Sequence, residues 1–251
     1  MLAYTFRNND PDKEIMLCIH GFMGTKDELE AQVSDAFVAY NTLYIDLPGH
    51  GGSPFNAEHQ SMEGAVDAIK ELLDALGISK LSLFGYSLGG RIAWLFSQRY
   101  PDYYKSLIIE SAHPGFETEA EKEASWEEFI PKLEEYRALS FPDFLKQWYE
   151  LPLFCKTKQV LSDEFLANKA NGDLNRYLDV MAAYHVSKQP YLVDSVSPPC
   201  PIHYITGSLD TKYSKLANRL AEYGLRRSII EDADHNVHLS QAKAFTILLR
   251  A

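Results

Sequence analysis

The chain has 251 residues, of which 46% are hydrophobic and 24% are charged, an ordinary composition for a globular protein. Its 24 basic and 35 acidic residues give a net charge of −11, which argues against nucleic acid or an anionic membrane surface as a partner. A small anionic substrate is not excluded, because a local basic pocket can override the overall field.

Membrane, secretion and metal signals are weak in the sequence. No apolar run approaches the ~20 residues that cross a bilayer, and the first residues lack the basic region and apolar core of a secretory signal. The cysteines Cys18, Cys155 and Cys200 have neither metal nor redox spacing. We therefore expect a cytoplasmic protein without a membrane partner, and a buried free thiol at Cys18.

The first half of the chain alternates apolar strands with helices. Residues 2–6 predict an edge strand, and the apolar run 15–19 is typical of a strand buried on both faces of a parallel sheet. This alternation predicts a parallel α/β sheet with right-handed crossovers. Further strands are expected at residues 41–46, 81–84 and 106–110, and helices at 27–39, 61–76 and 91–98.

The character of the sequence changes after residue 115. Residues 116–196 contain aromatic-rich amphipathic segments without a convincing strand, and their glutamates between 117 and 135 are expected to form a solvated helical face. We interpret 116–196 as a helical cap, inserted into a core made of 1–115 and 197–251. In the second part of that core we expect strands at 202–207 and 227–231, a helix ending near 223, and a closing helix at 236–250.

The segment Gly85-Tyr86-Ser87-Leu88-Gly89 has the pattern Gly-x-Ser-x-Gly between a predicted strand and a predicted helix. This context is typical of a nucleophile elbow, in which the serine lies on a turn so sharp that its neighbours must be nearly free of side chains. Gly85 and Gly89 meet that demand, and Gly90 allows close packing. We therefore expect Ser87 to be a nucleophile or a base.

A serine hydroxyl needs a histidine in hydrogen-bond reach, and the histidine needs a carboxylate to fix its tautomer. Asp210 and His235 each follow a predicted strand, so Ser87, Asp210 and His235 should meet at one sheet edge as a catalytic triad. His238 is expected to lie within the closing helix, and His20 to shape its own loop. Asp234, beside the histidine, could raise the proton affinity of the imidazole. The backbone amides of Phe22 and Leu88 are expected to form the oxyanion hole.

With these motifs the chain resembles the α/β-hydrolase superfamily over nearly its whole length. It is more narrowly similar to the MenH family, the 2-succinyl-6-hydroxy-2,4-cyclohexadiene-1-carboxylate synthases of menaquinone biosynthesis. The fold expected is an α/β-hydrolase fold, with a mostly parallel central sheet flanked by helices and a helical cap insertion. The resemblance is carried by residues 19–24, 46–51, 85–91 and 110–115 in the core, and more specifically by 148–154, 189–190 and 207–213.

The resemblance implies a lyase that eliminates pyruvate from a cyclohexene polycarboxylate, with no metal or organic cofactor. Arg91 matches a carboxylate-binding position of that family, and Tyr86 and Trp148 match aromatic pocket positions. At two further positions the family has arginines, whereas this chain has Ser125 and Lys169. Lysine keeps the charge but lacks the bidentate fork that fits a carboxylate.

Two other functions remain open at this point. The same triad could act in a carboxylesterase or thioesterase, which would hydrolyse small acyl esters through an acyl-serine intermediate. The fold could also serve as a ligand receptor with little catalysis, although an intact triad counts against it. The residues expected to bind the substrate could also have purely structural roles. Arg91 could pair with a surface carboxylate, Trp148 could only pack against its neighbours, and Lys169 could be exposed to solvent on the surface.

Overall fold

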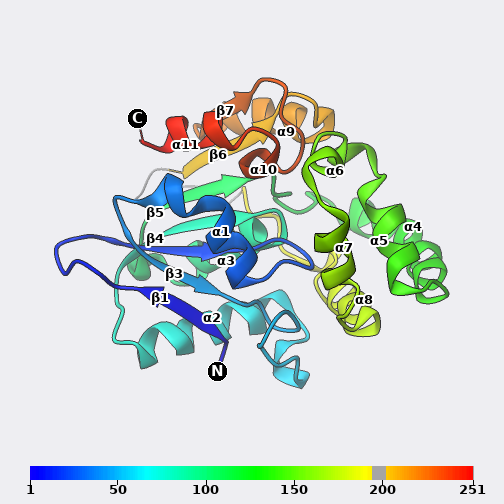
Figure 1. Cartoon of the computed structure of the whole chain (residues 1–251), viewed down its shortest axis with the longest axis horizontal. Helices are drawn as coiled ribbons and strands as arrows, with labels where there is room; N and C mark the ends of the chain where they lie inside the picture. The colour runs from blue at the N-terminus through cyan, green and yellow to red at the C-terminus, as the bar shows by residue number, and fades with distance from the viewer. Residues whose placement is uncertain (194–201, 251) are drawn as a thin grey trace.

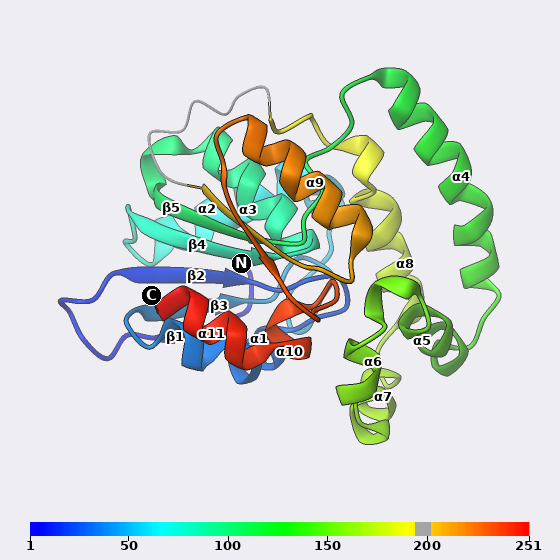
Figure 2. The same ribbon diagram turned by 90° about the horizontal axis from the view of Figure 1, so that it is seen from above.

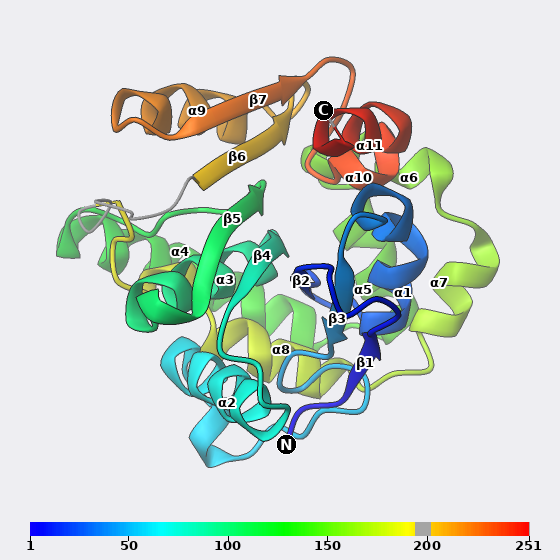
Figure 3. The same ribbon diagram turned by 90° about the vertical axis from the view of Figure 1, so that its left-hand side faces the viewer.

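The computed structural model describes residues 1–193 and 202–250, and at its centre is a seven-stranded sheet in the order β1-β3-β2-β4-β5-β6-β7 (Figure 3). Strand β1 is antiparallel to β3, and all other neighbouring strands are parallel. The predicted fold class is therefore confirmed. The strands are β1 (Tyr4–Arg7), β2 (Ile15–Ile19), β3 (Asn41–Ile45), β4 (Leu81–Tyr86), β5 (Tyr104–Glu110), β6 (Ile202–Gly207) and β7 (Arg226–Ile230).

Each face of the sheet has its own apolar core, because side chains alternate along the strands. In β2, Leu17 and Ile19 face one core, whereas Met16 and Cys18 face the other. Cys18 is a fully buried free thiol, and burial raises its pKa. The first face is covered by α2 (Met62–Ala75), α3 (Leu88–Arg99) and α9 (Thr211–Glu222), and the second by α1 (Lys26–Val33), α10 (Val237–Ser240) and α11 (Ala242–Arg250) (Figure 2).

Two predicted helices are divided in the structure. The helix expected at 27–39 ends at Val33 and continues as a 3-10 turn, Ser34–Phe37, which buries Phe37. The helix expected at 236–250 is interrupted at Gln241, whose φ of −139° and ψ of 49° are not helical. The Gln241 side chain donates to the backbone oxygen of Asp232 at 3.2 Å, so the interruption ties the helix to the loop before it.

Five helices follow β5 and gather at the end of the sheet toward which the parallel strands point (Figures 1 and 2). They enclose a separate apolar cluster that includes Phe144 and Leu178, and the glutamates of the first helix are exposed as expected. These helices are α4 (Glu119–Arg137), α5 (Phe141–Tyr149), α6 (Thr157–Val160), α7 (Asp163–Lys169) and α8 (Leu174–Ala183). The predicted cap boundary at 196 and 197, like Cys200, lies outside the described residues. None of the helices in residues 1–193 and 202–250 combines the length and apolar character needed to cross a bilayer.

One buried carboxylate joins these helices to the core. Asp234, in the loop after β7, is fully buried and accepts hydrogen bonds from the backbone N–H groups of Lys156 (2.9 Å) and Thr157 (2.6 Å). It also accepts from the Thr157 hydroxyl at 2.9 Å and from the N–H of Asn236 at 3.1 Å. Hydrogen bonds to a charged group are among the stronger ones in proteins, so this cluster fixes the start of α6 against the core.

We expect Asp234→Asn to lower the free energy of unfolding by ~2–4 kcal/mol, because an amide cannot accept from all four donors and leaves a buried N–H without a partner. Equilibrium urea unfolding measures this change. The matched control is Asp232→Asn, which removes only a half-exposed ion pair with Lys156 and should cost less than ~1 kcal/mol. Equal stability of the two variants would contradict the role given to Asp234.

Several histidines are kept neutral by the fold. Burial lowers the pKa of His20, His185 and His203 to about 4 each. Burial, followed by the charges of Lys212 and Arg91, lowers the pKa of His113 to about 3. A histidine in the unfolded chain has a pKa of ~6.5. Below that pH these histidines bind protons in the unfolded chain but remain neutral in the native protein.

The native protein should therefore lose stability as the pH falls from ~6.5 toward ~4, with each neutral histidine contributing at most ~2 kcal/mol of loss by pH ~5. Urea unfolding at pH 7.5 and 5.0 measures the loss. His203 is a residue of β6, and its Nε2 lies 2.9 Å from the hydroxyl of Ser228 in the neighbouring strand β7. His203→Asn should make the pH dependence shallower, and an unchanged slope in that variant would show that His203 is not one of the groups responsible.

Candidate active site

The serine turn has the geometry that its sequence context predicts. Strand β4 ends at Tyr86, helix α3 begins at Leu88, and Ser87 between them has φ 50° and ψ −110°. A Cβ atom at Gly85 would lie 2.4 Å from the backbone oxygen of Gly89, and one at Gly89 would lie 2.3 Å from that of Ile19. A non-glycine residue at positive φ costs on the order of 1–3 kcal/mol, so tight packing on both sides holds Ser87 in this strained conformation.

The structure brings the three expected catalytic side chains together. His235 Nε2 lies 3.0 Å from Ser87 Oγ, and His235 Nδ1 lies 2.6 Å from Asp210 Oδ2. A carboxylate can only accept, so Nδ1 donates to Asp210 and Nε2 is left to take the serine proton. Asp210 is also the N-cap of α9 and accepts from the N–H of Tyr213 at 3.3 Å, which fixes the carboxylate before it meets the histidine.

The two expected oxyanion-hole residues lie on the same side of Ser87. Leu88 is the first residue of α3, where a backbone N–H has no partner within the helix. Phe22 lines the same cavity as Ser87 and Leu88. Its loop is shaped by His20, whose Nδ1 lies 2.7 Å from the backbone oxygen of Gly21 and whose Nε2 accepts from the N–H of Leu47 at 3.0 Å. His20 thus shapes the loop that carries Phe22, and both of these ring contacts are with the backbone and not with Ser87 Oγ.

A cavity of about 220 Å³, here called the cap-side cavity, opens between Ser87 and the helices that follow β5. Its lining includes Leu88, Arg91, Trp148 and Tyr184. Arg91 donates to three neutral groups: the side-chain oxygen of Gln189, the backbone oxygen of Tyr184 (2.6 Å) and the sulfur of Met62 (3.2 Å). Burial lowers the pKa of Arg91 to about 10, so the guanidinium stays charged near neutral pH, and none of these three contacts is with a carboxylate.

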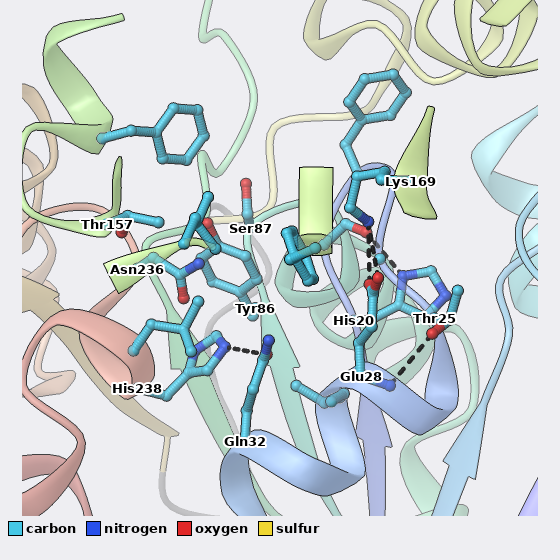
Figure 4. Close-up of a pocket in the computed structure, with 18 of the residues that line it drawn as sticks. His20, Thr25, Glu28, Gln32, Tyr86, Ser87, Thr157, Lys169, Asn236 and His238 are labelled. Carbon is cyan, nitrogen blue, oxygen red and sulfur yellow. Dashed lines mark hydrogen bonds and ion pairs between the residues drawn. The ribbon is translucent and has the colours of Figure 1, made fainter. Parts of the chain in front are cut away.

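Ser87 also borders a second space of about 70 Å³ on the other side, here called the polar chamber (Figure 4). Three of the predicted substrate-binding residues, Tyr86, Trp148 and Lys169, line it. Lys169 is already bound, however: its ammonium donates to the Met23 backbone oxygen at 2.6 Å and pairs with Glu28 at 3.0 Å. Its side chain is only 5% exposed, so Lys169 is neither solvated surface nor a free cation.

Sequence reasoning missed a buried pair below the triad. His238 Nδ1 lies 2.8 Å from the carboxylate of Glu110, and both side chains are fully buried. The backbone oxygen of Glu110 accepts from the N–H of Ser87 at 2.8 Å, and the Tyr86 ring lies between His235 and His238, with centroid distances of 5.6 and 4.9 Å. No local sequence pattern reveals this pair, because Glu110 and His238 are 128 positions apart.

Two other expectations change with the structure. The carboxylate of Asp234 accepts hydrogen bonds from Lys156, Thr157 and Asn236, and not from the imidazole of His235. Ser125 is a half-buried residue of α4 and is not among the residues that line either space beside Ser87. In the ranges that the structure describes, no cluster of three or more histidine, cysteine or acidic side chains could hold a metal ion.

The arrangement supplies a base, an activated hydroxyl and a cation at one point. His235 can take the proton of Ser87, and the serine oxygen can then attack a carbonyl or remove a proton from carbon. Phe22 and Leu88 line the same cavity as Ser87, and their backbone amides remain the predicted donors to negative charge on a substrate oxygen. Arg91 lies one helical turn beyond Ser87, where a substrate carboxylate can bind it.

Comparison with known proteins agrees with this geometry. A family model described as alpha/beta hydrolase fold matches residues 14–177. The chain is 30% identical over 239 residues to the 2-succinyl-6-hydroxy-2,4-cyclohexadiene-1-carboxylate synthase of Klebsiella pneumoniae subsp. pneumoniae, covering 95% of this chain and 93% of that protein. It is also 30% identical over 237 residues to the synthase of that name from Escherichia coli K12, covering 92% and 90% of the two chains.

Solved structures show the same fold. MenH from S. aureus superposes with a TM-score of 0.88 at 22% identity and covers 100% of this chain and 97% of that one. A thermophilic esterase from Thermogutta terrifontis superposes with a TM-score of 0.75 at 22% identity, covering 99% and 91%. From the matches to the family model and to the synthases, the chain belongs to the α/β hydrolase fold family and, within it, to the family of the 2-succinyl-6-hydroxy-2,4-cyclohexadiene-1-carboxylate synthases.

Proposed function

We propose that this chain is a lyase that performs the reaction of its synthase relatives, the elimination of pyruvate from a cyclohexene polycarboxylate in menaquinone biosynthesis. The observation that carries the proposal is the position of Arg91. Its partly buried charge lies beside the serine, in a cavity lined by no acidic side chain, and the groups to which it donates are neutral. Such a site favours a substrate with a carboxylate next to the reacting carbon.

The proposed mechanism uses the triad as a base for carbon. His235 takes the proton of the Ser87 hydroxyl, and the serine oxygen removes a proton from the substrate ring. The electrons of that C–H bond form a ring double bond, the ring C–O bond breaks, and pyruvate departs as its enolate, which takes up a proton. Asp210 orients His235, and the Phe22 and Leu88 amides stabilise the oxyanion charge that develops.

The remaining assignments concern binding and surroundings. We assign Arg91 to a substrate carboxylate, and Tyr86 and Trp148 to the walls of the site. Lys169 is assigned to holding the Met23 loop through Glu28, in place of the carboxylate contact expected from the sequence. Helices α4–α8 are proposed to act as a cap beginning at residue 116. The free thiols of Cys18 and Cys155 support a reducing cytoplasm as the compartment.

Ser87→Ala should abolish pyruvate release, lowering kcat by at least ~1,000-fold, because the variant lacks the oxygen that receives the ring proton. Pyruvate is measured with a coupled dehydrogenase, beside a parallel assay with p-nitrophenyl acetate. Hydrolysis of the ester by the wild-type protein without pyruvate release would replace the lyase with the esterase. Inertness to both compounds, with ligand-dependent stabilisation, would favour a receptor.

Asp210→Asn should lower kcat by about 1,000- to 10,000-fold, because an amide can donate to His235 Nδ1 and hold the imidazole in the wrong tautomer. The asparagine still caps α9, so the thermal midpoint should change little. Steady-state kinetics and a melting curve together separate the two effects. Wild-type kcat in a folded Asp210→Asn protein would show that another group orients the histidine.

A further inference from the structure

The cap-side cavity has a charge balance opposite to that of the whole protein. Its lining contains two basic side chains, Arg91 and Lys212, and no aspartate or glutamate, whereas the chain carries a net charge of −11. Two histidines, His113 and His185, also line it, but burial lowers their pKa to about 3 and about 4, so they are neutral near pH 7. The positive charge of this cavity therefore comes from Arg91 and Lys212.

Lys212 occupies a position that does not suit its charge. It is the second residue of α9, two positions after the N-cap Asp210, and the first turn of that helix has no acidic residue. A cation at a helix N-terminus opposes the helix dipole, and a carboxylate would be favoured there. A lysine at this position costs a little helix stability, which is understandable if its ammonium binds an anion outside the helix.

Lys212 has no ion-pair partner among the residues that the structure describes. Its ammonium lies over the ring of Tyr213, at 5.8 Å from the ring centroid. Lys212, Arg91 and His113 all line the cap-side cavity, so the two cations border the same space.

The other candidate cations are not available in the same way. Lys169 already forms an ion pair with Glu28, and position 125 is a serine. Only one of the three positions at which arginine was expected, position 91, therefore offers a charge that no acidic side chain neutralises. A polycarboxylate in this pocket would need a second cation from elsewhere, and Lys212 is the basic residue that lines the cavity with Arg91.

We infer that Lys212 is a substrate-binding residue, and that it and Arg91 form a two-cation site for two carboxylates of one substrate. The inference rests on the proposed function for the identity of that substrate. Lys212 follows Asp210 by two residues, so one helix start holds both the group that orients His235 and the second cation. The start of α9 thereby contributes both to the binding of substrate carboxylates and to the orientation of His235.

The test measures binding apart from turnover. The probe is 2-succinylbenzoate, the dianion that the proposed cyclohexadiene product would give on losing water, titrated into the full-length protein by calorimetry at low ionic strength. Lys212→Met, which keeps the stem and removes the charge, should weaken binding ~10-fold or more, whereas Lys212→Arg should stay within ~3-fold of wild type. In the pyruvate assay Lys212→Met should raise KM by a similar factor and leave kcat within ~3-fold.

Lys215→Met is the matched control, because Lys215 is an exposed residue of the same helix that does not line the cavity. It should bind the dianion as the wild type does. Equal binding by the Lys212→Met and Lys215→Met proteins would overturn the inference, as would a wild-type protein that does not bind the dianion. If Lys212→Met releases pyruvate with an unchanged KM, the role of Lys212 in binding is overturned and the proposed lyase function is not. If the dianion binds in a way that depends on Lys212 but no pyruvate is released, only the proposed lyase function is contradicted.

Discussion

The strained backbone of Ser87 is the constraint on which the rest of the site depends. A φ of 50° at a residue with a side chain is maintained only where its surroundings leave no alternative, and here Gly85 and Gly89 let β4 and α3 approach too closely for any Cβ atom. The turn lifts the hydroxyl toward His235 and starts α3 at Leu88. It also places Arg91 one turn later, with its N–H bonded to the Ser87 oxygen at 3.0 Å. One backbone conformation thus positions the Ser87 hydroxyl, the Leu88 amide and the Arg91 side chain.

The two sides of Ser87 differ in charge. In the polar chamber the ammonium of Lys169 forms an ion pair with Glu28 and donates a hydrogen bond to the backbone oxygen of Met23. In the cap-side cavity the basic groups meet neutral partners and no acidic side chain. A substrate with several carboxylates would accordingly be oriented by charge, with its anionic groups on the cap side and its reacting carbon near Ser87. The global charge of −11 gives no sign of this local asymmetry.

Much of the fold and the triad could be predicted from the sequence, because those features depend on local patterns. Apolar runs separated by helical segments indicate a parallel sheet, and Ser87, Asp210 and His235 each follow a strand whose end lies at the same edge. The pairing of Lys169 with Glu28 could not be predicted, because these residues are 141 positions apart and belong to different elements. The same holds for Glu110 and His238, 128 positions apart. A residue's type indicates its charge, but only the fold determines whether a partner already neutralises it.

The loop that carries His235 also connects the core to the proposed cap. Asp234 binds the start of α6, and the N–H of His235 itself donates to the Leu153 backbone oxygen at 3.1 Å. Phe154, next in sequence, packs edge-on against the His235 ring at 6.1 Å and tilted against Trp148 at 5.9 Å. A displacement of the cap around residues 153–157 would therefore strain contacts of the imidazole as well as the wall of the pocket. Because these contacts are shared, the position of the cap and the alignment of His235 with Ser87 are physically coupled, and substrate that orders one should order the other.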